Sequence, residues 1–213
     1  MGSFLKRIQA LVTALGFVFI SLWAQDKDLA GYYVPPVAVR PLTLSGSMGE
    51  FRATHFHTGY DFRVGGISGA PVYAVADGYV SRITVSAGGY GNALQVTHPN
   101  GTVSLYGHLE SFAPYIAAYV EEEQYAGQQF NIAMDCPPDM FPVKKGEQIG
   151  KAGNTGDSAG PHLHFEIRDR DSLLSYSYIT ANLIRKGLYE FEDTLPPEFR
   201  AVQFYGYSTD PHG

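Results

Sequence analysis

The sequence has a single cysteine, Cys136, among its 213 residues. A chain with one cysteine forms no internal disulfide, so side-chain packing must hold its fold together. At this length, and with 45% hydrophobic residues, the chain can bury a core that needs no covalent staple. We expect Cys136 to be a partly buried loop residue rather than a catalytic thiol.

The sequence also lacks any block rich in lysine and arginine, and its net charge is −6 at pH 7. Nucleic acids and anionic membrane surfaces are bound largely through such blocks. We therefore expect neither as a partner. Internal repeats and low-complexity tracts are also missing, which favours one compact domain.

Long hydrophobic runs are missing after the first 25 residues. Before that point, Lys6 and Arg7 precede an apolar run from Ala10 to Ala24. This run of about 15 residues is short of the roughly 20 that span a membrane, and its basic head is typical of a secretory signal. We predict export to the periplasm or the medium with cleavage after Ala24, and no stable membrane insertion afterwards. An uncleaved N-terminal anchor is the alternative.

Short runs with alternating or aromatic and β-branched residues follow from residue 37 onward and are separated by turns. The dipeptides Asp77-Gly78 and Asn100-Gly101 between such runs are typical of β-hairpins. The pattern predicts an all-β fold, mainly antiparallel sheet, with an edge position for the first run because it contains Pro41. The predicted strands are 37–45, 54–62, 71–76, 79–86, 93–98, 102–109 and 148–152.

Residues 110–142 break this pattern. Apolar and polar residues at helical spacing predict a helix over residues 114–127, and a proline-rich loop follows at 135–142. A second short helix could form at 179–188. The predicted division of the chain is a signal peptide at 1–25, a leader or edge strand at 26–47, a main domain at 48–186 with 110–142 inserted, and a tail at 187–213. The tail is either the start of a truncated second β module or an edge strand packed on the main sheet.

The stretch richest in candidate functional residues begins with a turn-rich run over residues 153–161, which leads into a predicted strand. Residues two apart on a strand point to the same face. His162 and His164 therefore stand side by side, with Leu163 and Phe165 on the opposite face. Such a pair alone is weak evidence, because many are ordinary surface residues.

His57 and Asp61 form a second constellation, because residues four apart on the predicted strand share a face. Together with one histidine of the pair at 162 and 164, they make a set of two imidazoles and one carboxylate. This set suits zinc and leaves one position open for a water nucleophile. Taken singly, each pair is more often a surface hydrogen bond.

The other histidines carry less information. His55 is a competing ligand or a supporting donor, and His98, which ends a strand before a turn, is expected to be structural. His108 closes a strand and is as often a rim residue as a catalytic one.

Four motifs occur in order over residues 48–170, and together they resemble the lysostaphin-type (LytM-like) zinc metallopeptidases. The motifs are His57-Thr-Gly-Tyr-Asp61, Tyr106-Gly-His108-Leu, Val143-Lys-Lys-Gly-Glu and Gly153-x-x-Gly-x-Ser-x-Gly-Pro-His162-Leu-His164-Phe-Glu. The resemblance implies an antiparallel β fold with a groove that holds one zinc ion. It also implies hydrolysis of amide bonds in the peptides of bacterial peptidoglycan.

Carried over by position, the resemblance implies that His57, Asp61 and His164 are the zinc ligands. It implies that His162 is the general base, with His108 as its partner in stabilising or protonating the transition state. Glu166 shares a strand face with His164 and is a candidate acceptor for the second N–H of that ring. Arg52 and His55 are candidates for stabilising the developing oxyanion. Residues 110–142 are longer than the family's compact loop, which leaves the shape of the groove open.

The function that this resemblance implies is that of an exported zinc metalloendopeptidase acting on peptidoglycan stem peptides and cross-bridges. Both D-Ala–diaminopimelate links and glycine bridges stay open as its substrate. The alternative is a non-catalytic wall-binding regulator that activates a peptidoglycan amidase, which the complete ligand set disfavours. A metal-storage or sugar-binding β protein explains the histidines poorly.

Overall fold

The computed structural model describes residues 29, 31–52, 55–169, 180, 183 and 189. The predicted signal peptide lies outside these residues, as do most of the possible helix at 179–188 and all of the predicted tail except Tyr189. Within the described part of the chain, no helix has the length and apolar character needed to cross a membrane.

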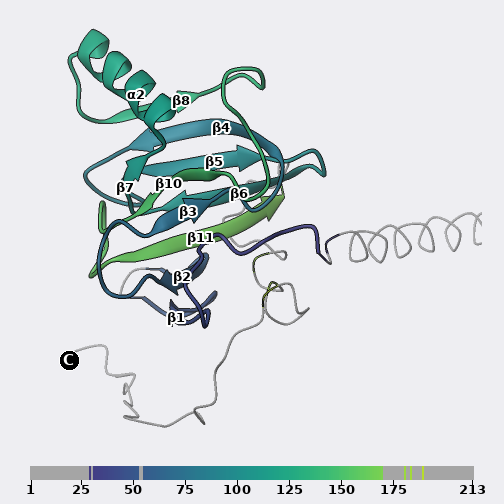
Figure 1. The fold of residues 1–213 in the computed structure, drawn as a ribbon. Coiled ribbons are helices and arrows are strands. Elements are labelled where there is room, and N and C mark those ends of the chain that lie inside the picture. Colours follow the sequence, from purple (N-terminus) through teal and green to yellow (C-terminus); the bar gives the residue numbers. More distant parts are fainter. Residues whose placement is uncertain are drawn as a thin grey trace, which may run out of the picture.

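An eight-stranded antiparallel sheet forms the body of the domain (Figure 1). The second, smaller sheet has three strands in the order β3 (Pro71–Tyr73), β10 (Gln148–Ala152) and β7 (Leu109–Phe112). The fold is thus mostly antiparallel β, as predicted. The order of the large sheet is β1 (Leu44–Gly46), β2 (Tyr60–Arg63), β11 (His162–Asp169), β6 (Thr102–Gly107), β5 (Ala93–Thr97), β4 (Gly78–Val85) and β8 (Ile132–Asp135), with β9 (Pro142–Val143) also pairing with β4.

One hydrophobic core joins the two sheets. Leu163 and Phe165 of β11 are fully buried in the same cluster as Val72 of β3 and Ile149 of β10. Leu163 and Phe165 alternate with His162 and His164 along β11, so the strand buries its apolar face in the core and turns its histidines the other way. The core therefore fixes the strand that carries the histidines.

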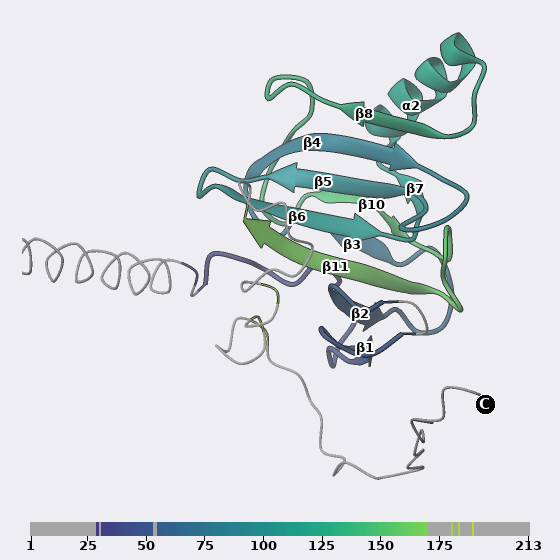
Figure 2. The ribbon, with the colours of Figure 1, turned by 180° about the vertical axis from the view of Figure 1, so that it is seen from behind.

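The helix in the inserted region is α2 (Pro114–Gly127), which confirms the predicted bounds. Pro114 opens its first turn, where a missing N–H costs nothing, and Ile116 and Val120 are its buried residues. The strands β7 and β8, which flank α2, were not predicted. Their runs are four residues each, and β8 pairs with β4, far away in sequence. Figures 1 and 2 show α2 beside β8, at the edge of the large sheet opposite β1 and β2.

The predicted strand at 71–76 ends at Tyr73, and two other predicted strands begin later than expected. The run at 37–45 is a strand only from Leu44, although it does lie at the sheet edge, and the run at 54–62 becomes β2 only at Tyr60. His57 therefore precedes the strand instead of lying on it. Gly59 explains the departure, because an added Cβ there would lie 2.6 Å from the Phe165 carbonyl oxygen, so the backbone passes close against β11.

Candidate metal centre

The register of the large sheet brings the candidate residues together. β2 and β11 pair so that Asp61 lies opposite His164, and cross-strand partners of this kind have neighbouring side chains. On its other side β11 pairs with β6, where His164 lies opposite Gly107. His108 follows at once, with φ 59°, and turns the chain out of β6 into β7. Histidines from separate segments thus reach one place.

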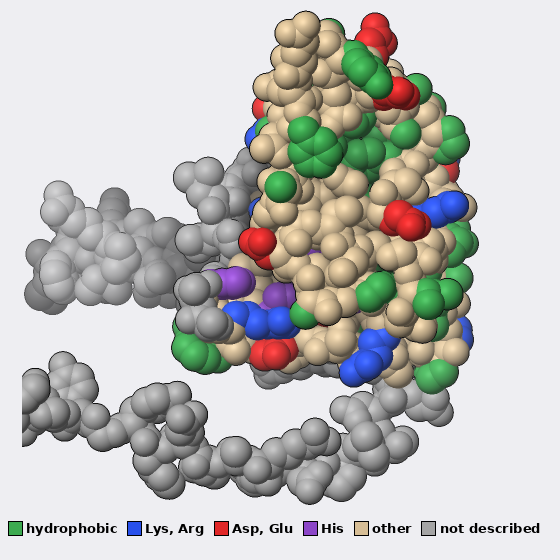
Figure 3. All heavy atoms as spheres, turned by 90° about the vertical axis from the view of Figure 1, so that its left-hand side faces the viewer, with side chains coloured by type: hydrophobic (Ala, Val, Ile, Leu, Met, Phe, Trp, Pro, Cys, Tyr) green, Lys and Arg blue, Asp and Glu red, His purple; other side chains and the backbone are tan. Residues whose placement is uncertain are grey.

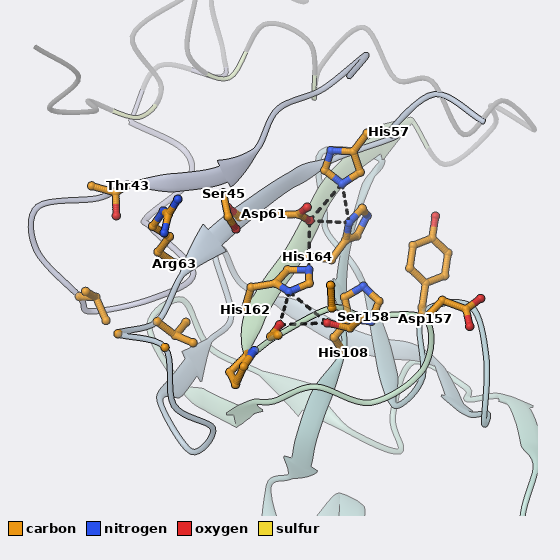
Figure 4. A pocket seen from close by; sticks show the side chains of 18 of the residues that line it. Thr43, Ser45, His57, Asp61, Arg63, His108, Asp157, Ser158, His162 and His164 are labelled. Carbon is orange, nitrogen blue, oxygen red and sulfur yellow. Dashed lines mark hydrogen bonds and ion pairs between the residues drawn. The ribbon is translucent and has the colours of Figure 1, made fainter. Parts of the chain in front are cut away.

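The structure places His57, Asp61 and His164 in one buried cluster (Figure 4). Asp61 Oδ1 lies 3.0 Å from both His57 Nε2 and His164 Nδ1, and these two ring nitrogens are 3.0 Å apart. Tetrahedral zinc with bonds of about 2.0–2.2 Å separates its ligand atoms by about 3.4 Å. The cluster therefore fits one zinc ion with small adjustments, and its donor set of two imidazole nitrogens and one carboxylate oxygen is one that zinc prefers.

The far nitrogens of the two rings are held by acceptors. His57 Nδ1 lies 2.9 Å from the Ser47 carbonyl oxygen, and His164 Nε2 lies 2.9 Å from Glu166 Oε1. Each ring therefore donates its N–H away from the cluster and turns a lone pair toward it. The interpretation of Glu166 as the acceptor for His164 is confirmed.

Glu166 is itself the centre of a hydrogen-bond network and is fully buried. Its Oε1 accepts bonds from Thr58 Oγ1 at 2.7 Å and Tyr90 Oη at 2.8 Å, while its Oε2 accepts from Arg168 Nε at 2.5 Å. Burial alone would raise the pKa of Glu166, but hydrogen bonds from His164 and Arg168 outweigh it and lower the pKa to about 2. The acceptor of the His164 N–H is therefore a carboxylate at neutral pH.

The second carboxylate oxygen of Asp61, Oδ2, also has a hydrogen-bond partner. Arg52 donates to Asp61 Oδ2 at 2.9 Å and also pairs with Glu50. Burial would raise the pKa of Asp61, but hydrogen bonds from the surrounding histidines lower it well below its usual range. Arg52, a candidate for oxyanion stabilisation, thus has a different place in the structure, as the partner of a candidate ligand. His55 lines the same cavity but lies outside the ligand cluster.

His108 and His162 face each other beside the cluster, with ring centroids 4.7 Å apart. Their Nδ1 atoms lie 2.8 Å from the carbonyl oxygens of Thr155 and Gly160, so both rings present Nε2 to the site. His162 Nε2 lies 3.3 Å from Asp61 Oδ1. Burial lowers the pKa of His108 to about 4, although the Thr155 hydrogen bond opposes this shift. A neutral imidazole is therefore available next to the candidate metal position.

The cluster opens into a groove of about 960 Å³. Figure 4 shows Thr43, Ser45 and Arg63 on one side of the cluster and Asp157 on the other, and Figure 3 shows histidines reaching the surface there, next to basic side chains. None of residues 110–142, all of which are described, lines this groove. The inserted region therefore does not shape it.

Among the described histidines, His98 stands apart from the site. His98 is buried, with Nδ1 2.9 Å from the Asp77 carbonyl oxygen and Nε2 2.8 Å from Ser104 Oγ, which agrees with a structural role. His212 lies outside the described residues. Sequence reasoning missed Thr58, Tyr90 and Arg168; of these only Arg168 had a signal, since it lies two residues after Glu166 on the same face of β11.

Comparison with known proteins agrees with this geometry. The pattern of peptidase family M23 matches residues 55–133 and 141–175, more than half of the chain. These matched segments contain the five candidate ligands and proton-transfer residues, which are His57, Asp61, His108, His162 and His164. The chain therefore belongs to peptidase family M23.

Individual relatives match over part of their length. The DD-carboxypeptidase/endopeptidase Mpg of Neisseria meningitidis is 38% identical over 112 residues, which are 53% of this chain and 20% of the relative. The peptidoglycan DD-endopeptidase ShyB of Vibrio cholerae is 34% identical over 116 residues, 54% of this chain and 21% of the relative. The structure of lysostaphin from Staphylococcus simulans superposes with a TM-score of 0.50 at 24% identity, covering 74% of this chain and 55% of lysostaphin, and so shares the fold. The chain spans about a fifth of the length of these sequence relatives.

Proposed function

We propose that this protein is an exported zinc metalloendopeptidase that hydrolyses peptide cross-links of bacterial peptidoglycan. The observation that carries the proposal is the buried cluster of His57, Asp61 and His164, whose ligand atoms all lie within 4.8 Å of one another at a groove of about 960 Å³. Membership of a peptidase family and relatives named as peptidoglycan endopeptidases support it. We further propose that residues 48–186 form the catalytic domain and residues 1–25 direct export.

The proposed ligands are His57 Nε2, Asp61 Oδ1 and His164 Nδ1. A zinc ion held by them would act as the Lewis acid that activates a water molecule and polarises the scissile carbonyl group. The carbonyl of Ser47 and the carboxylate of Glu166 keep the two imidazoles in the tautomers that this role needs.

His162 and His108 are proposed to move the proton. His162 Nε2 lies closest to the ligand cluster and takes the role of general base toward the attacking water. His108, whose Nδ1–H donates to the Thr155 carbonyl oxygen, lies beside it and is neutral at pH 7. Once its Nε2 takes up a proton, the ring can donate to the developing oxyanion or to the leaving amine. The Nδ1 bonds of both rings direct their Nε2 atoms to the site for these transfers.

Zinc content and the release of muropeptides from purified cell wall test the proposal. His57→Ala and His164→Ala should lose both stoichiometric zinc and hydrolysis, whereas His108→Ala should keep zinc and lose most hydrolysis. His98→Gln is the matched control, because it changes a buried histidine outside the groove. A His164→Ala protein that released muropeptides at the normal rate would rule out this assignment. Wild-type protein that held no zinc, cleaved no wall and stimulated an amidase would favour the regulator instead.

A further inference from the structure

Two arginines in the groove have no acidic partner in the described part of the chain. Arg52, Arg82 and Arg168 each pair with a carboxylate, whereas Arg40 and Arg63 have none within salt-bridge distance among the described residues. Both are exposed and both line the groove. Unpaired guanidinium groups in a groove are available to a ligand.

Arg63 is the better placed of the two. Arg40 donates through the same terminal nitrogen to the carbonyl oxygens of Val37 and Val39, which ties that group to its own backbone. Arg63 Nε donates to the Leu44 carbonyl oxygen at 3.0 Å, and no described residue accepts from its terminal nitrogens. The inner end of the guanidinium is thus anchored while its outer edge faces the groove (Figure 4).

On β2, Arg63 is the next residue after Asp61 whose side chain lies on the same face of the sheet. It follows Asp61 by two residues on β2, and its partner across the strand pair is His162. Same-face positions on a strand are about 6.6 Å apart. An extended peptide advances about 3.3–3.6 Å per residue, so this spacing equals about two substrate residues. A residue that adjoins the scissile amide falls within that span of Arg63.

The ligand that suits such a group is a carboxylate, because the planar guanidinium matches it with two parallel N–H bonds. In a cross-link from D-alanine to the side-chain amine of diaminopimelate, a free carboxylate sits on the carbon that bears the amide nitrogen. In a glycine bridge, no carboxylate lies next to an internal amide. On the opposite wall, the carboxylate of Asp157 accepts from the backbone N–H of Gly89 at 2.8 Å.

We propose that Arg63 binds the carboxylate beside the scissile amide nitrogen and thereby selects cross-links to diaminopimelate over glycine bridges. This inference rests on the proposed function and adds its substrate class. Arg63 acts in it as a specificity-determining residue that bonds to the amine-side part of the substrate.

The test uses two purified muropeptide dimers, one with the free diaminopimelate carboxylate and one with the corresponding carboxamide. For wild-type zinc-loaded protein, kcat/KM should be about tenfold higher for the carboxylate dimer than for the carboxamide dimer. This ratio is expected for one solvent-exposed charge-assisted contact. Arg63→Gln should lose this preference through a higher KM for the carboxylate dimer, with unchanged zinc content. Arg63→Lys should keep part of it. Arg82→Gln, which removes a paired arginine on β4, is the matched control and should keep the full preference.

The possible failures are distinct. If wild-type protein cleaved both dimers and Arg63→Gln kept the tenfold preference, the inference would be overturned while the proposed function stood. Equal cleavage of the two dimers by wild-type protein would also overturn the inference and leave the proposed function standing. Cleavage of neither dimer by zinc-loaded wild-type protein would overturn the proposed function, and the inference with it.

Discussion

Glutamine in place of Glu166 removes the negative charge behind His164 and keeps the side-chain shape. The glutamine oxygen can still accept from Thr58, Tyr90 and His164. Its NH₂ group would replace the oxygen that accepts from Arg168, so two hydrogen-bond donors would face each other there. The change therefore weakens two charge-assisted bonds without opening a cavity. It separates the effect of charge from that of packing.

The magnitude follows from the pKa of Glu166, which the network lowers from 4.5 to about 2. At 1.36 kcal/mol per pKa unit, ionisation of this buried group contributes about 3 kcal/mol to folding. Because the folded-state pKa is the lower one, this stability is present above pH 4.5 and is lost as the pH falls toward 2. At pH 7 we expect Glu166→Gln to lower the free energy of unfolding of the metal-free protein by about 2–3 kcal/mol.

Zinc affinity should fall as well. Removal of the carboxylate that orients a ligating histidine typically costs about 10–100-fold in metal affinity. The dissociation constant can be measured by competition with a chromophoric chelator, and the stability by urea denaturation of the metal-free protein. Arg168→Gln is the matched control, because it breaks the same ion pair and keeps the His164–Glu166 bond, so it should lower stability with a smaller effect on zinc. If Glu166→Gln bound zinc as tightly as the wild-type protein, the reasoning would be refuted and strand geometry alone would orient His164.

Other predictions concern the scaffold of the site. Gly156 has φ 72°, and an added Cβ would collide with backbone atoms of the turn at residues 89–91, so Gly156→Ala should cost more than about 2 kcal/mol in urea denaturation. Gly101→Ala, with φ 82° and open space around it, should cost only about 1 kcal/mol, and equal costs would contradict the steric argument. Phe165→Ala should cost about 3–5 kcal/mol by the same measurement, because its ring is fully buried; a cost below 1 kcal/mol would mean that the core closes over the gap. Burial lowers the pKa of His98, so the folded protein binds fewer protons than the unfolded chain and its unfolding free energy should fall as the pH drops below 6.5. His98→Gln should flatten this slope between pH 5 and 7, and an unchanged slope would assign it to other groups.

Local features were predictable because they depend on neighbours in the sequence. The alternation that puts His162 and His164 on one face of β11 follows from strand geometry, and the helical spacing after Pro114 gave the bounds of α2. The prediction that His57 lies on a strand with Asp61 was wrong in its local geometry, yet the two side chains do meet, 3.0 Å apart. The chain reaches that contact through a close approach of Gly59 to the backbone of β11, which strand periodicity does not describe.

By itself, the sequence determined the class of fold, the faces of the central strand and the residue types that can hold a metal. The turn at Asn100-Gly101 joins the paired strands β5 and β6, as its sequence predicted, whereas Asp77-Gly78 joins β3 and β4, which lie in different sheets, so the hairpin expected there was wrong. The tertiary structure alone decided which strands far apart in the chain are neighbours. Antiparallel pairing joins residues far apart in the chain, as in the contact between His57 and His164, 107 positions apart, or between Tyr90 and Glu166. Side-chain periodicity gives a face and a direction but carries no information on which distant segment lies next to it. The network behind His164 and the position of Arg63 opposite His162 therefore depend on β2, β6 and β11 lying side by side.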